Sequence, residues 1–129
     1  MLQKHLSGQA LITIQQRLTR VDYIIIGEYS MLGQASLGWI DRRCRQATGL
    51  HEVLFGGKSV ILFGDPAQLP PVRDKPLYHS KPSSTIAKQG YCAYQMIDKV
   101  VILRVNRRVL GSELDQVLFK QLLTEVTEW

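Results

Sequence analysis

The feature that most constrains the fold is residues 60–72, which read V-I-L-F-G-D-P-A-Q-L-P-P-V. A short, continuous apolar run that ends at a glycine is typical of a strand buried on both faces of a parallel sheet. Ligands of parallel sheets gather at the carboxyl ends of the strands, so Asp65 and Gln68 are predicted to lie at such a rim. An apolar strand followed by a proline turn is also common in proteins that have no ligand site there. The rest of the chain must therefore show whether this turn belongs to a site.

Two more short apolar runs, residues 23–26 and 100–103, are predicted to be strands of the same sheet. Each of the three runs ends in polar residues: Gly27 with Glu28, Asp65 with Gln68, and Asn106 with Arg107 and Arg108. Because the carboxyl ends of parallel strands lie on one edge, these clusters are expected to converge. An acid that deprotonates water, an amide that senses a γ-phosphate and an arginine that neutralises charge are what phosphoryl transfer requires.

Between the predicted strands the sequence favours helices. Leucines, isoleucine and alanine at four-residue spacing predict a helix over residues 3–18, and a second helix is predicted around residues 37–47, with Gly49 just beyond its end. The other face of that second helix carries Asp41 and three arginines, which we expect to be solvated rather than to bind DNA. Strands that alternate with helices predict an α/β fold with a parallel sheet, in one domain over residues 1–129.

The remaining segments are a loop and a last helix. Residues 73–90 are polar and are predicted to form a mobile loop, and Gly56 with Gly57 is predicted to form the turn into the central strand. The pattern S-E-L-D from Ser112 is a capping box, which predicts a carboxyl-terminal helix.

Composition excludes several other classes of protein. The chain has 129 residues, of which 45% are hydrophobic, and a net charge of +5, which favours polyanionic partners modestly. Its two cysteines lack C-x-x-C spacing, so a disulfide scaffold or zinc ribbon is not expected. No apolar run reaches the roughly 20 residues of a membrane span and no signal peptide is evident, so we expect an intracellular protein that does not enter a membrane.

Three motifs together resemble one family. G-D-x-x-Q-L-P-P-V at residues 64–72 resembles the third helicase motif of Pif-one-like DNA helicases, which belong to superfamily one. I-I-I-G-E-Y-S-M-L resembles their Walker B segment, and L-R-V-N-R-R resembles their next motif, so the similarity covers almost the whole chain. The resemblance implies a partial RecA-like sheet of the P-loop NTPase type with flanking helices, from the first lobe of such a helicase.

The resemblance also implies roles for particular residues. Glu28 would be the catalytic base, Gln68 the γ-phosphate sensor and Arg108 the arginine finger, with Gly64 and Asp65 beside the nucleotide. The implied function is 5′-to-3′ unwinding of single-stranded or forked DNA, driven by ATP with Mg²⁺, in DNA repair, recombination and telomere maintenance. A monomer in the nucleus, or alternatively in mitochondria, is expected.

Three departures from the family pattern limit this expectation. Gly27 occupies the position of the aspartate that anchors Mg²⁺, and glycine has no side-chain oxygen to offer. No G-x-x-x-x-G-K-[ST] phosphate loop occurs in these 129 residues, and Pro66 replaces a common aromatic residue. We therefore expect no metal ligand at position 27 and no ATP hydrolysis by the isolated chain.

Two alternatives come from other functional classes. The chain could be a catalytically inactive helicase remnant that serves as a binding or scaffold domain, or has no function; Gly27 and the missing phosphate loop favour this. It could also be a basic DNA-binding module without nucleotide chemistry. The second alternative is disfavoured because Tyr91 and Tyr94 are the one close aromatic pair near the basic loop, which is little for a base-stacking platform.

Overall fold

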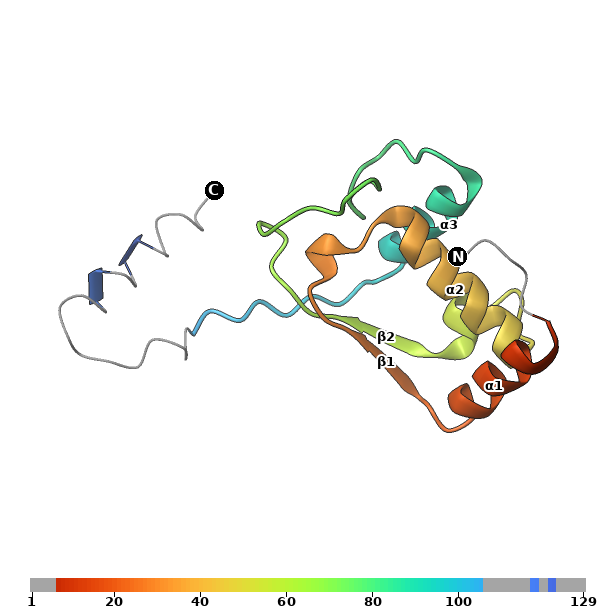
Figure 1. The fold of residues 1–129 in the computed structure, drawn as a ribbon. Helices are drawn as coiled ribbons and strands as arrows, with labels where there is room; N and C mark the ends of the chain where they lie inside the picture. Colours follow the sequence, from red (N-terminus) through yellow and green to blue (C-terminus); the bar gives the residue numbers. More distant parts are fainter. Residues whose placement is uncertain (1–6, 106–116, 119–120, 123–129) are drawn as a thin grey trace. The chain divides into compact units, whose positions relative to one another are not determined.

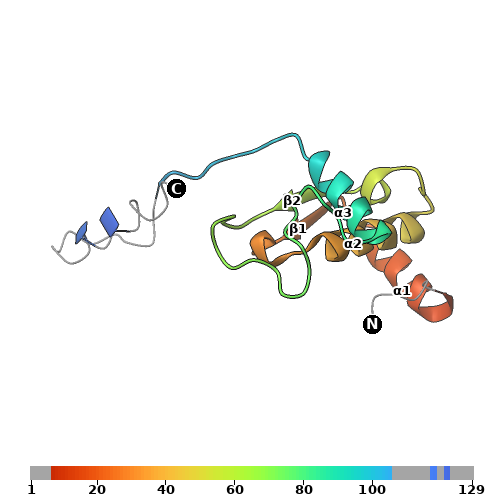
Figure 2. The same cartoon turned by 90° about the horizontal axis from the view of Figure 1, so that it is seen from above.

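The computed structural model describes residues 7–105, 117–118 and 121–122. The chain divides into two compact units, Met1–Asp98 and Lys99–Trp129, and the named helices and strands belong to the first (Figures 1 and 2). In chain order they are α1 (Gly8–Leu18), β1 (Tyr23–Ile26), the 3₁₀ turn η1 (Tyr29–Met31), α2 (Gln34–Thr48), the 3₁₀ turn η2 (Leu54–Gly57), β2 (Ser59–Leu62) and α3 (Thr85–Gln95). The fold of the described residues is thus α/β, as predicted.

The sheet of the described residues has two parallel strands, β1 and β2, in register from Tyr23 opposite Ser59 to Ile26 opposite Leu62. The predicted bounds of β1 are confirmed, and β2 begins and ends one residue earlier than predicted. Helix α2 connects the two strands, as a crossover between parallel strands requires. Its buried Leu37 and Cys44 form the core together with Phe55, Leu77 and Ala93.

Only one face of this sheet is covered in the described residues, whereas the sequence predicted burial on both. Ile24 and Val60 pack against the core, but the alternate side chains of Tyr23 and Ile25 are 64% and 65% exposed. The reason is that successive side chains of a strand point to opposite faces, and the core lies on one of them.

The prediction of a third strand over residues 100–103 is wrong for this structure. These residues have no strand assignment, and their side chains are 71–83% exposed. They belong to the second unit of the chain. An apolar segment becomes a strand only where a neighbouring strand pairs its N–H and C=O groups, so composition alone does not suffice.

The predicted helix ends are confirmed where the structure describes them. α1 ends at Leu18, as expected, and the predicted residues 3–6 lie outside the described residues. α2 ends before Gly49, which has the left-handed conformation (φ 74°) of a helix cap. Of the helix predicted from Ser112, residues 117–118 and 121–122 are described and are helical, and the remainder lies outside the described residues.

α3 was missed by the sequence prediction, which assigned its first six residues to a loop. Ser84 caps the helix by accepting a hydrogen bond from the Ala87 N–H at 3.2 Å. α3 packs closely on α2 because Gly38 and Gly90 lie at the contact: a Cβ on Gly90 would stand 1.8 Å from the Gln34 carbonyl oxygen. The helix is therefore fixed by a contact between segments about fifty residues apart in sequence.

The segment before α3 is anchored to the amino end of α2. The Asp74 carboxylate accepts hydrogen bonds from the N–H groups of Ala35 (3.1 Å) and Ser36 (3.2 Å), which a helix start leaves without partners. Leu77 is 2% exposed and joins the core. None of the helices among the described residues has the length and apolar character needed to cross a membrane.

Candidate functional site

The carboxyl ends of β1 and β2 are joined by hydrogen bonds that continue past both strands. The Phe63 N–H donates to the Ile26 carbonyl at 2.8 Å, and the Tyr29 N–H donates to the Phe63 carbonyl at 3.0 Å. Gly64 is then pressed against the segment after β1, since a Cβ there would lie 2.9 Å from the Tyr29 nitrogen and 3.3 Å from the Glu28 Cα. The backbone at Glu28 thus lies against Gly64, the residue before the predicted cluster of Asp65 and Gln68, at one edge of the sheet.

Glu28 has an unusual backbone conformation at this edge. Its φ of 52° and ψ of 46° are left-handed, and a residue with a Cβ adopts this conformation at a cost of about 1–2 kcal/mol. Its side chain is exposed. Strained conformations that the surrounding structure enforces are concentrated at functional sites. The strain directs attention to Glu28 independently of the sequence motif.

Asp65 and Gln68 form a tight turn after β2. An Asp65 carboxylate oxygen accepts from the Ala67 N–H at 2.9 Å, and the Asp65 carbonyl accepts from the Gln68 N–H at 3.1 Å. Asp65 therefore shapes the loop, while Gln68 stands exposed at its end. Arg108, with Asn106 and Arg107, lies outside the described residues, so the third cluster is not placed.

Two residues of this edge were missed by the sequence analysis. Burial raises the pKa of the Tyr29 phenol, and the nearby Tyr94 and Asp65 raise it further. The hydroxyl oxygen of Ser30 is buried and has no hydrogen-bond partner among the described residues. Their position directly after Glu28 was the signal available in the sequence.

The residues at this edge do not by themselves fit a Mg²⁺ ion. Among the described residues no group of three His, Cys, Asp or Glu side chains is placed to hold a metal. Gly27 is exposed, and a Cβ built on it would meet nothing within 4 Å. A side chain could therefore start at this position, so the glycine is not required by a close approach of other atoms.

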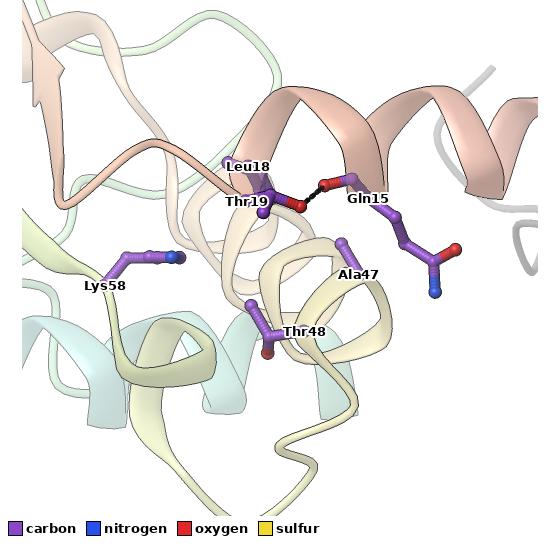
Figure 3. A pocket seen from close by; sticks show the side chains of 6 residues that line it. All are labelled: Gln15, Leu18, Thr19, Ala47, Thr48 and Lys58. Atoms are coloured by element: carbon purple, nitrogen blue, oxygen red, sulfur yellow. Dashed lines mark hydrogen bonds between the residues drawn. The ribbon is translucent and has the colours of Figure 1, made fainter.

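A small pocket lies elsewhere, between α1, the end of α2 and the residue before β2 (Figure 3). Its volume is about 240 Å³, and it is lined by Gln15, Leu18, Thr19, Ala47, Thr48 and Lys58. Residues 57–59 read G-K-S, like the end of a phosphate loop, but they lead into a strand, whereas a phosphate loop leads into a helix. None of the predicted site residues that the structure describes lines this pocket.

The charged face of α2 is not simply solvated, which corrects the sequence prediction. Asp41 is fully buried and accepts hydrogen bonds from Arg45 Nε (2.9 Å to each oxygen), the Phe55 N–H (2.6 Å) and Gln89 Nε2 (2.6 Å). Arg42 donates to Gln89 Oε1 at 3.2 Å. This network, which we call the Asp41 network, joins α2, η2 and α3.

Comparison with known proteins found similarity to DNA helicases. The chain is 38% identical over 74 residues to the ATP-dependent DNA helicase PIF1 of Trypanosoma brucei brucei (strain 927/4 GUTat10.1). The match spans 57% of this chain and 8% of the relative, so the chain corresponds to a small part of that protein's length. No solved structure was found to match. The sequence profile described as PIF1-like helicase matches residues 7–129, which is nearly the whole chain and includes both strands and the edge they form. The chain therefore belongs to the PIF1-like helicase family.

Proposed function

We propose that this chain forms part of a RecA-like lobe of an ATP-dependent DNA helicase and supplies one side of its ATP-hydrolysing edge. The observation that carries the proposal is the meeting of Glu28 with Gly64 at the carboxyl ends of two parallel strands, held by the Tyr29 N–H to Phe63 carbonyl hydrogen bond at 3.0 Å. Nucleotides bind at such edges in open α/β sheets.

In this proposal Glu28 is the general base. Its exposed carboxylate accepts the proton of the water that attacks the γ-phosphate of ATP. The left-handed backbone at Glu28 sets the direction in which its side chain leaves the chain, at the edge where the two strands end. Gln68 senses the γ-phosphate from the end of its turn, and Arg108 neutralises the charge that develops in the transition state.

A catalytically inactive remnant is the second candidate, and Gly27 is the observation that favours it. Position 27 has room for a Cβ but carries no side-chain oxygen, and the described residues around it do not make a metal site. Hydrolysis depends mainly on positioning and charge neutralisation around the phosphates. The isolated 129-residue chain is therefore expected to release no phosphate from ATP, and Gly27→Asp alone is expected not to change that.

The test is a chimaera in which this chain, with Gly27→Asp, replaces the matching segment of an active PIF1-like helicase. DNA-stimulated phosphate release should appear, and Glu28→Gln should abolish it while nucleotide binding persists. Glu52→Gln, which removes an exposed carboxylate beyond α2, is the matched control and should leave the rate unchanged. Loss of Arg108 should lower turnover on the order of 10³-fold or more.

Two results would refute the proposal. A chimaera that hydrolyses ATP equally well with Glu28→Gln would show that Glu28 is not the base. A chimaera that folds and binds nucleotide but stays inactive with Gly27→Asp would favour the inactive remnant.

The finer expectations concern the activity and the cellular setting of a whole PIF1-like helicase. We infer 5′-to-3′ unwinding of single-stranded or forked DNA by a monomer, with roles in repair, recombination and telomere maintenance, in the nucleus or in mitochondria. The family membership of the chain supports the link to DNA. Strand-displacement assays on substrates with a 5′ or a 3′ tail would test the direction.

A further inference from the structure

The segment after β2 is attached to the segment after β1 at two places rather than one. The first is the contact of Gly64 with the backbone of residues 28–29, directly beyond the strands. The second is at the start of α2, where the Asp74 carboxylate accepts hydrogen bonds from two helix N–H groups. Residues 65–73, which include the proposed γ-phosphate sensor Gln68, therefore form a loop that is held at both ends.

The second attachment, which we call the Asp74 clasp, consists of side-chain and backbone hydrogen bonds. The Oδ2 atom of Asp74 accepts from the N–H groups of Ala35 at 3.1 Å and Ser36 at 3.2 Å. The Gln34 N–H donates to the Lys75 carbonyl at 2.9 Å. These three N–H groups lie in the first turn of α2, where the helix has no carbonyl to accept them. The clasp therefore supplies acceptors that the helix itself lacks.

The clasp also explains the glycine at position 33, directly before α2. A Cβ built on Gly33 would lie 2.1 Å from the Asp74 Cγ, so a side chain there would displace the carboxylate. Gly33 has a φ of −90° and a ψ of 164°, a conformation that any residue can adopt. The close approach of Asp74, and not the backbone conformation, is therefore what requires a glycine.

The backbone beside the clasp is strained. Arg73, the residue before Asp74, has a φ of 59°, which is unfavourable for a residue that has a Cβ. Such a conformation persists only where the surrounding structure enforces it. The chain after Arg73 is fixed by the hydrogen bonds of Asp74 and by Leu77, which is 2% exposed and belongs to the core. Release of the clasp would let Arg73 return to an ordinary conformation.

We propose that Asp74 is a positioning residue, whose clasp keeps the loop of residues 65–73 closed and so limits the positions that Gln68 can take. Without the clasp, the nearest attachment of the loop to the segment after β1 would be the contact at Gly64. A loop that is ordered before a ligand binds loses less entropy on binding. The clasp is a property of the chain without nucleotide, and only its effect on nucleotide binding rests on the proposed function.

The first test is ¹⁵N relaxation of the 129-residue chain. In the unsubstituted chain the Ala67 and Gln68 amides should be rigid, with order parameters of about 0.85, and Asp74→Ala should lower them below about 0.6. Ser84→Ala is the matched control, because it removes the cap of α3, at a similar cost to stability, and leaves the clasp intact. Asp74→Asn, which keeps one acceptor oxygen, should recover part of the rigidity.

Two results of this test would overturn the proposal. One is order parameters below about 0.6 at Ala67 and Gln68 in the unsubstituted chain, a measurement that needs no variant. The other is an equal loss of rigidity with Asp74→Ala and Ser84→Ala, which would show that the loop responds to overall stability. If Asp74→Ala does not fold, Gly33→Ala takes its place, because it keeps the carboxylate but displaces it.

The second test uses the chimaera that carries Gly27→Asp. Asp74→Ala should weaken binding of a non-hydrolysable ATP analogue about fivefold, the factor that corresponds to one capping interaction, and should leave ADP binding unchanged. The reason is that ADP lacks the γ-phosphate that Gln68 is proposed to contact. Equal weakening for both nucleotides, or the same effect with Ser84→Ala, would overturn the positioning role.

A further variant separates this proposal from the proposed function. Gln68→Ala in the chimaera should remove the preference for the ATP analogue over ADP. If that preference is unchanged, Gln68 is not the γ-phosphate sensor and the proposed function fails at this residue. The relaxation measurement on the 129-residue chain decides the clasp in either case.

Discussion

Replacement of Asp41 by alanine should be one of the most destabilising single changes in the first unit of the chain. The carboxylate is 0% exposed and accepts hydrogen bonds from Arg45, the Phe55 N–H and Gln89. Removal of one partner of a buried ion pair costs about 3–5 kcal/mol, and each buried donor left without an acceptor costs about 1–3 kcal/mol. The side chain of the partner, Arg45, is 23% exposed, so water can solvate it. We therefore expect the total loss of stability to lie near the lower ends of these ranges, at about 4 kcal/mol.

The measurement is thermal and urea unfolding followed by circular dichroism. A loss of about 4 kcal/mol is a large part of the stability of an ordinary domain. In a unit of this size it lowers the melting temperature by about 20 °C. Asp41→Asn keeps the shape and one acceptor oxygen and should lose about half as much. Glu52→Ala, at an exposed carboxylate nearby, should change stability by less than about 0.5 kcal/mol. If Asp41→Ala proved as mild as Glu52→Ala, the Asp41 network would not hold α2, η2 and α3 together.

Four further predictions concern packing and the thiols. Gly90→Ala should destabilise the chain by about 1–3 kcal/mol in urea unfolding, because its Cβ would collide with the α2 backbone, whereas Gly27→Ala meets no atom and should be close to neutral. Gly64→Ala should separate the ends of β1 and β2, and amide hydrogen exchange at Tyr29 should then become faster; unchanged protection would contradict the close approach. Exposed Cys92 should react with a thiol reagent at pH 8 at once and buried Cys44 only on unfolding, since burial, with the charge of Asp41, raises the Cys44 pKa to about 11. Because this raised pKa favours the protonated folded state, stability should fall as the pH rises from about 9 towards 11, and a Cys44→Ala variant should lack that fall.

The sequence by itself determined α1, β1, β2 and the end of α2, and it predicted that the ends of the two strands meet. The apolar runs predicted β1 and β2 to within one residue, and Gly49 marked the end of α2. Parallel strands place their carboxyl ends on one edge, so the proximity of Glu28 and Gly64 followed from strand direction alone. The strand positions and the helix cap depend on residues close in sequence, for which side-chain period and glycine conformation are sufficient signals.

Tertiary structure decided everything that depended on a distant partner. Residues 100–103 are as apolar as the two strands, yet they have no strand assignment, because pairing needs a neighbour that composition does not supply. The α2–α3 contact rests on two glycines, Gly38 and Gly90, whose missing side chains let backbones touch. From the sequence, Asp41 was predicted to be one more charge on a solvated helix face. In the structure it is buried, because Arg45, Phe55 and Gln89 contact it from three elements. A buried charge is tolerated only where such partners meet, and that meeting is a property of the folded chain.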